Sequence, residues 1–127
     1  MSNHLFVYGT LMRGEEREGI VAHLSMVPAI TRGQLWRAPA GYPALFIDPN
    51  GHPIRGELLR IEQPSIFMVL DLYEGVAEGL YTREIIDVQT EDGPIQAWAY
   101  IMSKKQLRLA GCQAIKTMDW RKISPKR

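Results

Sequence analysis

Residues 95–102 read Ile-Gln-Ala-Trp-Ala-Tyr-Ile-Met, and this stretch decides the fold class. Alternate side chains of a β-strand point to opposite faces, and in this stretch both faces are apolar. A strand of this kind lies in the middle of a sheet, or in a closed barrel with a helix over it. The stretch therefore predicts a curled or barrel-like sheet that a helix covers.

Five further segments have the composition of strands, being rich in Ile, Leu, Val, Tyr and Trp. They are His4–Tyr8, Ala29–Arg37, Tyr42–Asp48, Ile54–Ile61 and Leu80–Gln89. Two turn sequences, Asn50-Gly51 and Asp92-Gly93, lie between apolar runs. Both suit turns that need a positive φ, so each predicts a β-hairpin.

Two segments have the periodicity of a helix. In Glu15–Met26, apolar residues recur every three or four positions, and acids lie in the first turn, where they suit the helix dipole. Pro64–Tyr73 begins with a proline suited to a first turn, and Gly75 follows it as a residue that ends helices. The predicted fold class is therefore α+β, a small mixed β-barrel with few helices.

The length of 127 residues and the ordinary composition predict one domain over residues 1–127. Cys112 is the only cysteine, which excludes an internal disulfide and is compatible with a reducing cytosol. No apolar run approaches the roughly 18 residues of a membrane span, and the first residues lack the features of a signal peptide. We therefore expect a soluble cytoplasmic protein.

The charge is unevenly distributed along the chain. Residues 103–127 carry a net charge of +7, whereas residues 1–102 carry −6. A basic segment of this kind can bind nucleic acid or an anionic surface, but its basic residues are scattered, which favours a solubilising tail. Because apolar residues such as Leu107 and Trp120 interrupt the charges, we expect Lys104–Met118 to cross back over the barrel as irregular or short helical structure.

The motifs of several enzyme classes are absent. The sequence has no phosphate-binding loop, no dinucleotide-binding glycine motif, no serine nucleophile elbow and no HExxH. His4, His23 and His52 lie far apart, with no Cys or carboxylate cluster at ligand spacing. We therefore expect neither a metal site nor a bound cofactor.

Two segments carry chemistry. In Val7-Tyr8-Gly9-Thr10-Leu11 an apolar strand runs into a glycine turn, whose successive N–H groups can bind an anion or a carbonyl oxygen; the alternative is a tight strand exit. Glu74 immediately precedes Gly75, at the negative end of the predicted helix and beside apolar neighbours. Both influences raise the pKa of a carboxylate and make it a better base, and Asp71 adds repulsion if it faces the same way. The alternative is a solvent-exposed Glu at a helix end.

Together these segments resemble the γ-glutamylcyclotransferase-like family, also called AIG2-like. The matching residues are Phe6–Leu11, Tyr42–Leu45, Gly56–Leu58, Leu70-Asp71, Glu74-Gly75 and Tyr81–Arg83, with a late Asp119-Trp120 pair. The resemblance implies a small mixed barrel with a cavity at one end. It implies that the turn of Tyr8, Gly9, Thr10 and Leu11 holds a glutamyl group, that Glu74 is the acid/base, and that Tyr81 is a wall or hydroxyl donor of the site.

The function implied by the resemblance is release of 5-oxoproline from a γ-glutamyl amino acid or γ-glutamyl amine, without a cofactor. The compact length is similar to the γ-glutamylamine or small bacterial branch rather than to longer, glutathione-specific members. Loops such as Ala38–Tyr42 and Ala77–Leu80 are expected to select the leaving group. Two alternatives stay open: a catalytically weak small-ligand-binding protein of the same fold, and a partner or nucleic-acid adaptor working through the basic tail. We expect a monomer or a weak homodimer.

Overall fold

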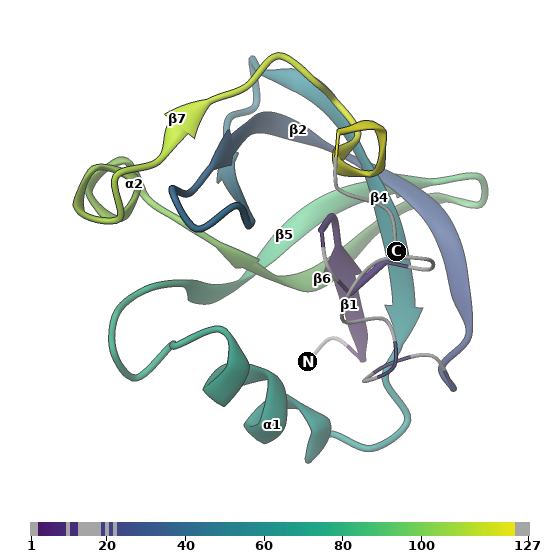
Figure 1. Cartoon of the computed structure of the whole chain (residues 1–127). Helices are drawn as coiled ribbons and strands as arrows, with labels where there is room; N and C mark the ends of the chain where they lie inside the picture. Colours follow the sequence, from purple (N-terminus) through teal and green to yellow (C-terminus); the bar gives the residue numbers. More distant parts are fainter. Residues whose placement is uncertain (1–2, 10, 13–18, 20, 22, 124–127) are drawn as a thin grey trace.

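The computed structural model describes residues 3–9, 11–12, 19, 21 and 23–123. Five strands close into a barrel in the order β2-β4-β1-β6-β5, because β5 pairs back with β2 through Ile30 and Gln89 (Figure 1). These strands are β1 (His4–Val7), β2 (Met26–Arg37), β4 (His52–Arg60), β5 (Thr82–Thr90) and β6 (Gly93–Ile101). The pairing of β1 with β6 is parallel and the other pairings are antiparallel, so the predicted mixed barrel is confirmed.

Two shorter strands extend the sheet at β2. The strand β3 (Pro43–Ile47) pairs with the last part of β2, and β7 (Gln113–Ala114) pairs with the same part through Trp36 and Arg37. The end of β2 therefore carries two neighbours, one from the middle of the chain and one from its C-terminal segment.

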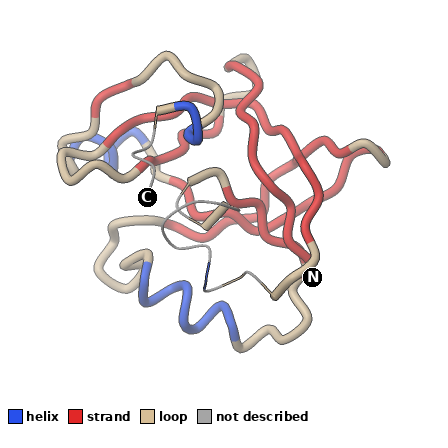
Figure 2. Tube along the Cα trace, turned by 45° about the vertical axis from the view of Figure 1, so that its right-hand side comes forward, coloured by secondary structure: helices blue, strands red, loops and turns tan. Residues whose placement is uncertain are grey.

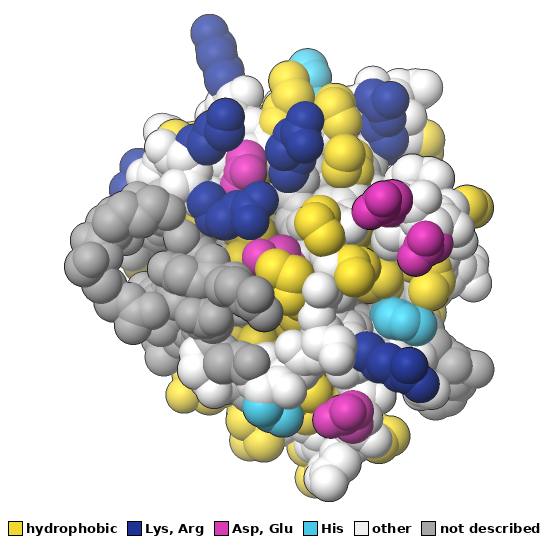
Figure 3. Space-filling view, turned by 90° about the vertical axis from the view of Figure 1, so that its right-hand side faces the viewer, with side chains coloured by type: hydrophobic (Ala, Val, Ile, Leu, Met, Phe, Trp, Pro, Cys, Tyr) yellow, Lys and Arg dark blue, Asp and Glu magenta, His cyan; other side chains and the backbone are white. Residues whose placement is uncertain are grey.

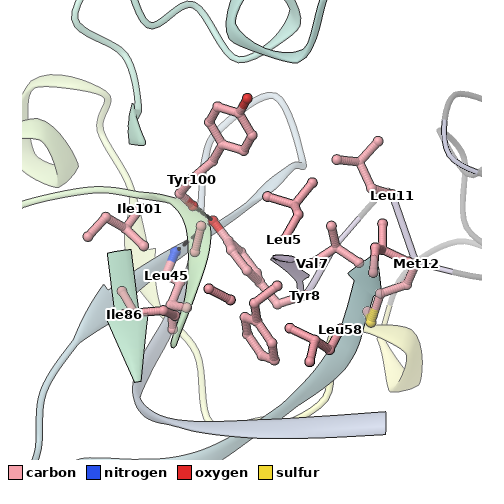
Figure 4. Close-up of a cluster of buried hydrophobic side chains, with 14 of the residues drawn as sticks. Leu5, Val7, Tyr8, Leu11, Met12, Leu45, Leu58, Ile86, Tyr100 and Ile101 are labelled. Atoms are coloured by element: carbon pink, nitrogen blue, oxygen red, sulfur yellow. Dashed lines mark hydrogen bonds between the residues drawn. The ribbon is translucent and has the colours of Figure 1, made fainter. Parts of the chain in front are cut away.

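The hydrophobic core fills the barrel (Figure 4). Phe6 of β1, Leu35 of β2 and Leu45 of β3 are each at most 1% exposed. Close approach of β1 and β4 depends on Gly56, since a Cβ at this position would lie 2.6 Å from Cζ of Phe6. Full burial of a large apolar side chain stabilises a fold by about 1.5–3 kcal/mol, so these contacts hold the barrel closed.

The helix α1 (Ile66–Tyr73) lies outside the barrel in the connection from β4 to β5 (Figure 2). It buries Phe67 and Leu70, and the Phe67 ring meets Trp98 of β6 edge-on, with centroids 6.3 Å apart. The outer face of β6 is therefore covered by a helix, as its apolar composition predicts. The expected helix over Pro64–Tyr73 is confirmed, with a start two residues later.

The C-terminal segment packs against the barrel. After β6, α2 (Lys104–Leu109) begins with a capping box formed by Ser103 and Gln106, and a 3₁₀ turn, η2 (Trp120–Lys122), follows β7. Trp120 is only 2% exposed. The expected return of this segment across the barrel is confirmed, and its pairing as β7 adds a strand to the expectation.

Of three further local predictions, one falls largely outside the described residues, one is confirmed and one is wrong. The helix expected over Glu15–Met26 falls largely outside the described residues, and its last residue, Met26, lies in β2. Asp92-Gly93 forms the expected hairpin between β5 and β6, with Gly93 at φ 109°. The hairpin expected at Asn50-Gly51 is wrong: neither residue has a positive φ, and the flanking strands β3 and β4 both pair with β2. A local turn signal does not specify which strands become neighbours.

Within the described part of the chain, no helix has the length and apolarity needed to cross a membrane.

Candidate active site

Glu74 lies at the C-terminal end of α1, where its sequence context places it. It is the C-cap of the helix, and its N–H donates to the Leu70 carbonyl at 2.9 Å. Gly75 follows with φ 63°, and a Cβ there would come within 3.2 Å of Leu80 Cβ. The loop is fixed by a hydrogen bond from the Leu80 N–H to the Gly75 carbonyl at 3.0 Å. This geometry turns the chain sharply after Glu74 and leaves its side chain half-buried.

Tyr8 follows β1 and connects three strands through its hydroxyl. The hydroxyl donates to the carbonyl of Tyr100 in β6 at 2.6 Å and accepts from the N–H of Leu45 in β3 at 3.2 Å (Figure 4). The side chain is only 7% exposed. Tyr8 is thus a structural anchor at the point where β1 ends and the glycine turn begins.

The glycine turn is present and closely packed. The N–H of Met12 donates to the Gly9 carbonyl at 3.0 Å, which brings the ends of this segment together. A Cβ on Gly9 would overlap Cγ of Pro43, so only glycine lets the turn lie against β3. Thr10 lies outside the described residues. The Leu11 side chain is buried in the core with Met12, on the other side of β1 from the Tyr8 hydroxyl.

Tyr81 joins the same region from the loop before β5. Its hydroxyl donates to the Pro43 carbonyl, and its ring lies 6.1 Å from the Tyr42 ring at an angle of 49°. Pro43 also lies against Gly9. The glycine turn, β3 and Tyr81 therefore form one packed unit. The Tyr81 proton is used within the protein, so toward a ligand the residue offers its ring and a hydroxyl lone pair.

The negative charge of the Glu74 carboxylate acts on four tyrosines around the site. Burial raises the pKa of Tyr8, Tyr42, Tyr81 and Tyr100 above the ordinary value of 10.0, and in each case the negative charge of Glu74 raises it further. All four phenols are therefore neutral at physiological pH and act as hydroxyl groups. The tyrosines on which this charge acts come from four places in the fold: the residue after β1, the β2–β3 loop, the loop before β5, and β6.

Asp71 does not add the uncompensated repulsion that the sequence left open. Its carboxylate is paired with Arg83 of β5, with Nε–Oδ1 at 2.9 Å and Nη2–Oδ2 at 3.2 Å. The Tyr100 hydroxyl also donates to Oδ1 at 2.7 Å. Burial acts to raise the pKa of Asp71, but the hydrogen bonds from Arg83 and Tyr100 outweigh it and hold the pKa below its usual value.

Two other kinds of reactive group could add chemistry to the site: the thiol of Cys112 and side chains that could bind a metal ion. Cys112 is half-buried, burial raises the pKa of its thiol, and its charge state is coupled to Tyr8, Tyr42 and Tyr81. Among the residues that the structure describes, no three His, Cys, Asp or Glu side chains form a group that could hold a metal ion.

The structure brings Glu74, Tyr8, Gly9 and Tyr81 into one region, and it adds two residues that sequence reasoning did not name as site residues. These are Tyr42 and Tyr100. Tyr100 had a usable signal, because alternation along β6 places it on the same face as Trp98, under the helix that ends at Glu74. Tyr42 had one as well, since it begins the stretch Tyr42–Leu45 that resembles the family and ends the loop Ala38–Tyr42 that is expected to select the leaving group.

Comparison with known proteins shows the family of the chain and the proteins that share its fold. A family model described as "Gamma-glutamyl cyclotransferase, AIG2-like" matches residues 5–122. The sequence is 29% identical over 123 residues to "Putative gamma-glutamylcyclotransferase YkqA" of Bacillus subtilis, covering 95% of this chain. The chain spans only 42% of the length of that relative.

Solved structures share the fold. The crystal structure of YkqA aligns with a TM-score of 0.73 and 26% identity, covering 96% of this chain and 40% of that one. An AIG2-like protein from Mus musculus aligns with a TM-score of 0.74 and 20% identity, covering 97% and 90% of the two chains. A structure named gamma-glutamyl cyclotransferase aligns with a TM-score of 0.63 and 18% identity, covering 87% and 81%.

Proposed function

The chain belongs to the gamma-glutamyl cyclotransferase, AIG2-like family, and from this premise we propose that it releases 5-oxoproline from a γ-glutamyl amino acid or γ-glutamyl amine. The observation that supports the proposal most is the position of Glu74. Glu74 is the C-cap of α1, and its negative charge acts on four neutral tyrosines, among them Tyr81, which packs through Pro43 against the glycine turn after β1. This gives one proton acceptor next to a set of hydroxyl and main-chain groups that can orient a polar substrate.

The proposed reaction needs no nucleophile from the protein. The α-amino nitrogen of the substrate attacks its own γ-carbonyl carbon, a five-membered ring forms, and the bond from that carbon to the leaving amine breaks. Fixing the orientation of such an intramolecular attack is equivalent to an effective concentration of about 10⁵–10⁸ M. The main task of the protein is therefore to hold the substrate in its cyclising conformation.

Proton transfer is the second task, and we assign it to Glu74. A free α-amino group has a pKa near 8, so it is largely protonated at neutral pH and cannot attack. In the proposed mechanism Glu74 accepts a proton from the α-ammonium group, which frees the amine to attack, and donates it to the departing amine nitrogen. The attacking nitrogen then gives up its second proton to Glu74, which passes it to the freed amine, so that the neutral lactam and a protonated amine are released. General acid–base catalysis of this kind contributes about 10²–10⁴ in rate.

Substrate binding is assigned to Tyr8, Gly9, Thr10, Leu11 and Tyr81. The turn closed by Gly9 and Met12 supports binding of the α-carboxylate or of the developing oxyanion through main-chain N–H groups. Because the Tyr8 hydroxyl is used in two internal hydrogen bonds, its proposed contribution is to place this turn and to present its ring.

The contacts of the C-terminal segment favour a structural role for this segment over binding of nucleic acid or a partner. Arg121 is paired with Asp119 at 2.9 Å and with the buried Glu57 at 3.5 Å. On the face seen in Figure 3, Lys and Arg side chains are separated by hydrophobic and other side chains. We keep the proposals of one domain over residues 1–127, a cytoplasmic location, and a monomer or weak homodimer.

The experiment that tests the proposal is a substrate panel. The purified protein is incubated with γ-glutamyl amino acids, γ-glutamyl amines and glutathione, and released 5-oxoproline is measured by chromatography. We expect release from at least one γ-glutamyl amino acid or amine, together with an equimolar amount of free amine. Binding of 5-oxoproline without turnover of any member of the panel would instead favour the ligand-binding alternative.

A further inference from the structure

Arg83 makes the main polar connection between α1 and the barrel. From β5 it forms two parallel hydrogen bonds with the Asp71 carboxylate, at 2.9 and 3.2 Å. Its guanidinium carbon also lies 4.5 Å from the ring centroids of both Phe67 and Trp98. One side chain thus contacts two residues of the helix and one of β6. Bidentate pairing combined with ring contacts is specific to the planar guanidinium group.

The apolar anchoring of the helix is modest by comparison. Of the eight residues of α1, only Phe67 and Leu70 are buried. On the opposite side Met68 and Leu72 are 71% and 77% exposed. The last turn, which carries Glu74, follows Leu70 and Asp71 directly, so the contact between Asp71 and Arg83 lies within one helical turn of the proposed base.

The same pair controls the charge near Glu74. Asp71 and Glu74 are three residues apart in a helical turn, a spacing at which Cβ atoms are about 5–6 Å apart. The Arg83 guanidinium compensates the Asp71 charge, and the Tyr100 hydroxyl supplies a further hydrogen bond to it at 2.7 Å. Loss of Arg83 would leave one carboxylate uncompensated beside the other.

We propose that Arg83 is a positioning residue for Glu74, which fixes the last turn of α1 on the barrel through Asp71 and balances the Asp71 charge beside the base. The inference rests on the proposed function and deepens it. Arg83 acts on the reaction through Asp71 and the helix, with no contact to substrate assigned to it.

Several titratable groups besides Arg83 surround this region, and the test must separate their effects. The described groups that act on it come from every element packed there: Asp71 on α1, Tyr8 after β1, Tyr42 in the β2–β3 loop, Tyr81 before β5, Tyr100 on β6 and Cys112 before β7. Burial raises the pKa of the tyrosines and of the Cys112 thiol, so none of these becomes charged below neutral pH. The Asp71–Arg83 pair is therefore the one expected to change the acid limb of the rate profile, the low-pH range in which kcat rises as the base ionises.

The test compares kcat against pH for Arg83→Gln, Asp71→Asn and the double variant. Arg83→Gln leaves Asp71 uncompensated, disfavours ionised Glu74, and moves the acid limb of the profile to higher pH. Asp71→Asn leaves the cation uncompensated and moves the limb to lower pH. Because the pair is partly exposed, with side chains 24% and 30% accessible, we expect each shift to be about half a pH unit. The double variant restores the limb to its original position.

The geometric role has its own readout. Arg83→Gln, and the double variant, are expected to lower kcat by about 10–100-fold while changing KM little, since displacing a catalytic group by about 1 Å is costly. Arg83→Lys keeps the charge and loses the bidentate fit, so it should lower kcat without shifting the limb. Arg32→Gln is the matched control, because Arg32 is exposed on β2 and hydrogen-bonds to the Gly51 carbonyl.

The outcomes separate this inference from the proposed function. No turnover in the unaltered protein, or full turnover in Glu74→Gln, would reject the proposed function. If Glu74→Gln abolishes turnover while Arg83→Gln and Asp71→Asn keep kcat and the acid limb unchanged, the positioning role is wrong. Equal losses in all variants without opposite shifts also overturn it, as a merely structural effect. If thermal melting shows that Arg83→Gln does not fold, Asp71→Asn and Arg83→Lys decide by the same criteria.

Discussion

Replacing Tyr8 by Phe removes one oxygen atom and leaves the ring, so it isolates the hydroxyl that connects β1, β3 and β6. Two main-chain groups lose their partner in this variant: the Leu45 N–H and the Tyr100 carbonyl. Both contacts are buried, and Tyr8 itself is 7% exposed, so water has little access to replace the lost bonds.

The magnitude follows from this count. A buried polar group left without a partner costs about 1–3 kcal/mol, so two such groups lower the free energy of unfolding by about 2–6 kcal/mol. For a chain of this length, a loss of about 3 kcal/mol lowers Tm by roughly 10 °C. Urea unfolding measures the effect, and we expect a lower midpoint with an unchanged slope, since the same surface is exposed on unfolding.

Tyr42→Phe is the matched control, because Tyr42 is partly exposed and its hydroxyl makes no hydrogen bond within the described part of the chain. Surface substitutions of this size usually change stability by no more than about 0.5 kcal/mol. The reasoning is refuted if Tyr8→Phe unfolds at the same urea concentration as the unaltered protein, or if the control loses as much stability as Tyr8→Phe.

Three further predictions concern the tail, alkaline pH and metal ions. Ending the chain after Pro125 should leave Tm unchanged, whereas removing the chain from Trp120 onward exposes the cavity of a buried Trp and should cost about 3–5 kcal/mol; equal melting of both would show that the segment adds no stability. Burial raises the pKa of Tyr8, Tyr81 and Tyr100 in the fold, so their stability contribution is complete below pH 10.0 and is lost as pH rises above it. Tyrosinate absorbance and unfolding should therefore appear together, and ionisation of all tyrosines in a folded protein would contradict this. Activity should survive EDTA, because the substrate supplies its own nucleophile; loss that one divalent ion restores would contradict the mechanism.

The barrel was predictable because four of its five strands are nine residues or longer and have the composition of strands. Apolar residues on both faces of β6 require a cover on each side, and the structure supplies the core within and α1 outside. The end of α1 was predictable for a similar reason, since Gly75 has the positive φ that few other residues adopt.

Which strands pair with one another was harder to predict from the sequence. Asn50-Gly51 has the composition of a hairpin turn, yet the chain crosses from one edge of β2 to the other, so that Gly33 is opposite both Ile47 and His52. A Cβ at Gly33 would overlap the Phe46 carbonyl, so the crossing depends on close backbone contact. Such contacts join distant segments and leave no local pattern in the sequence.

The sequence predicted the proposed catalytic acid of the site, Glu74, but only some of the residues around it. Glu74 is marked by its place before Gly75, a local feature. Tyr42 and Tyr100 reach it from other elements, and the pairing of Asp71 with Arg83 joins residues 12 positions apart across a helix–sheet contact. Side-chain direction across such a contact follows from the fold, which the sequence alone did not provide.

The most direct test of the account is steady-state release of 5-oxoproline by Glu74→Gln, beside Glu78→Gln as the control in the same loop. Gln keeps the shape and hydrogen-bonding capacity of Glu but cannot accept the proton of the α-ammonium group. We predict that Glu74→Gln lowers turnover by at least about 10²–10⁴ with little change in binding of 5-oxoproline or in Tm, and that Glu78→Gln turns over normally. Near-normal turnover in Glu74→Gln, or a loss only in Glu78→Gln, would show that the base is another carboxylate.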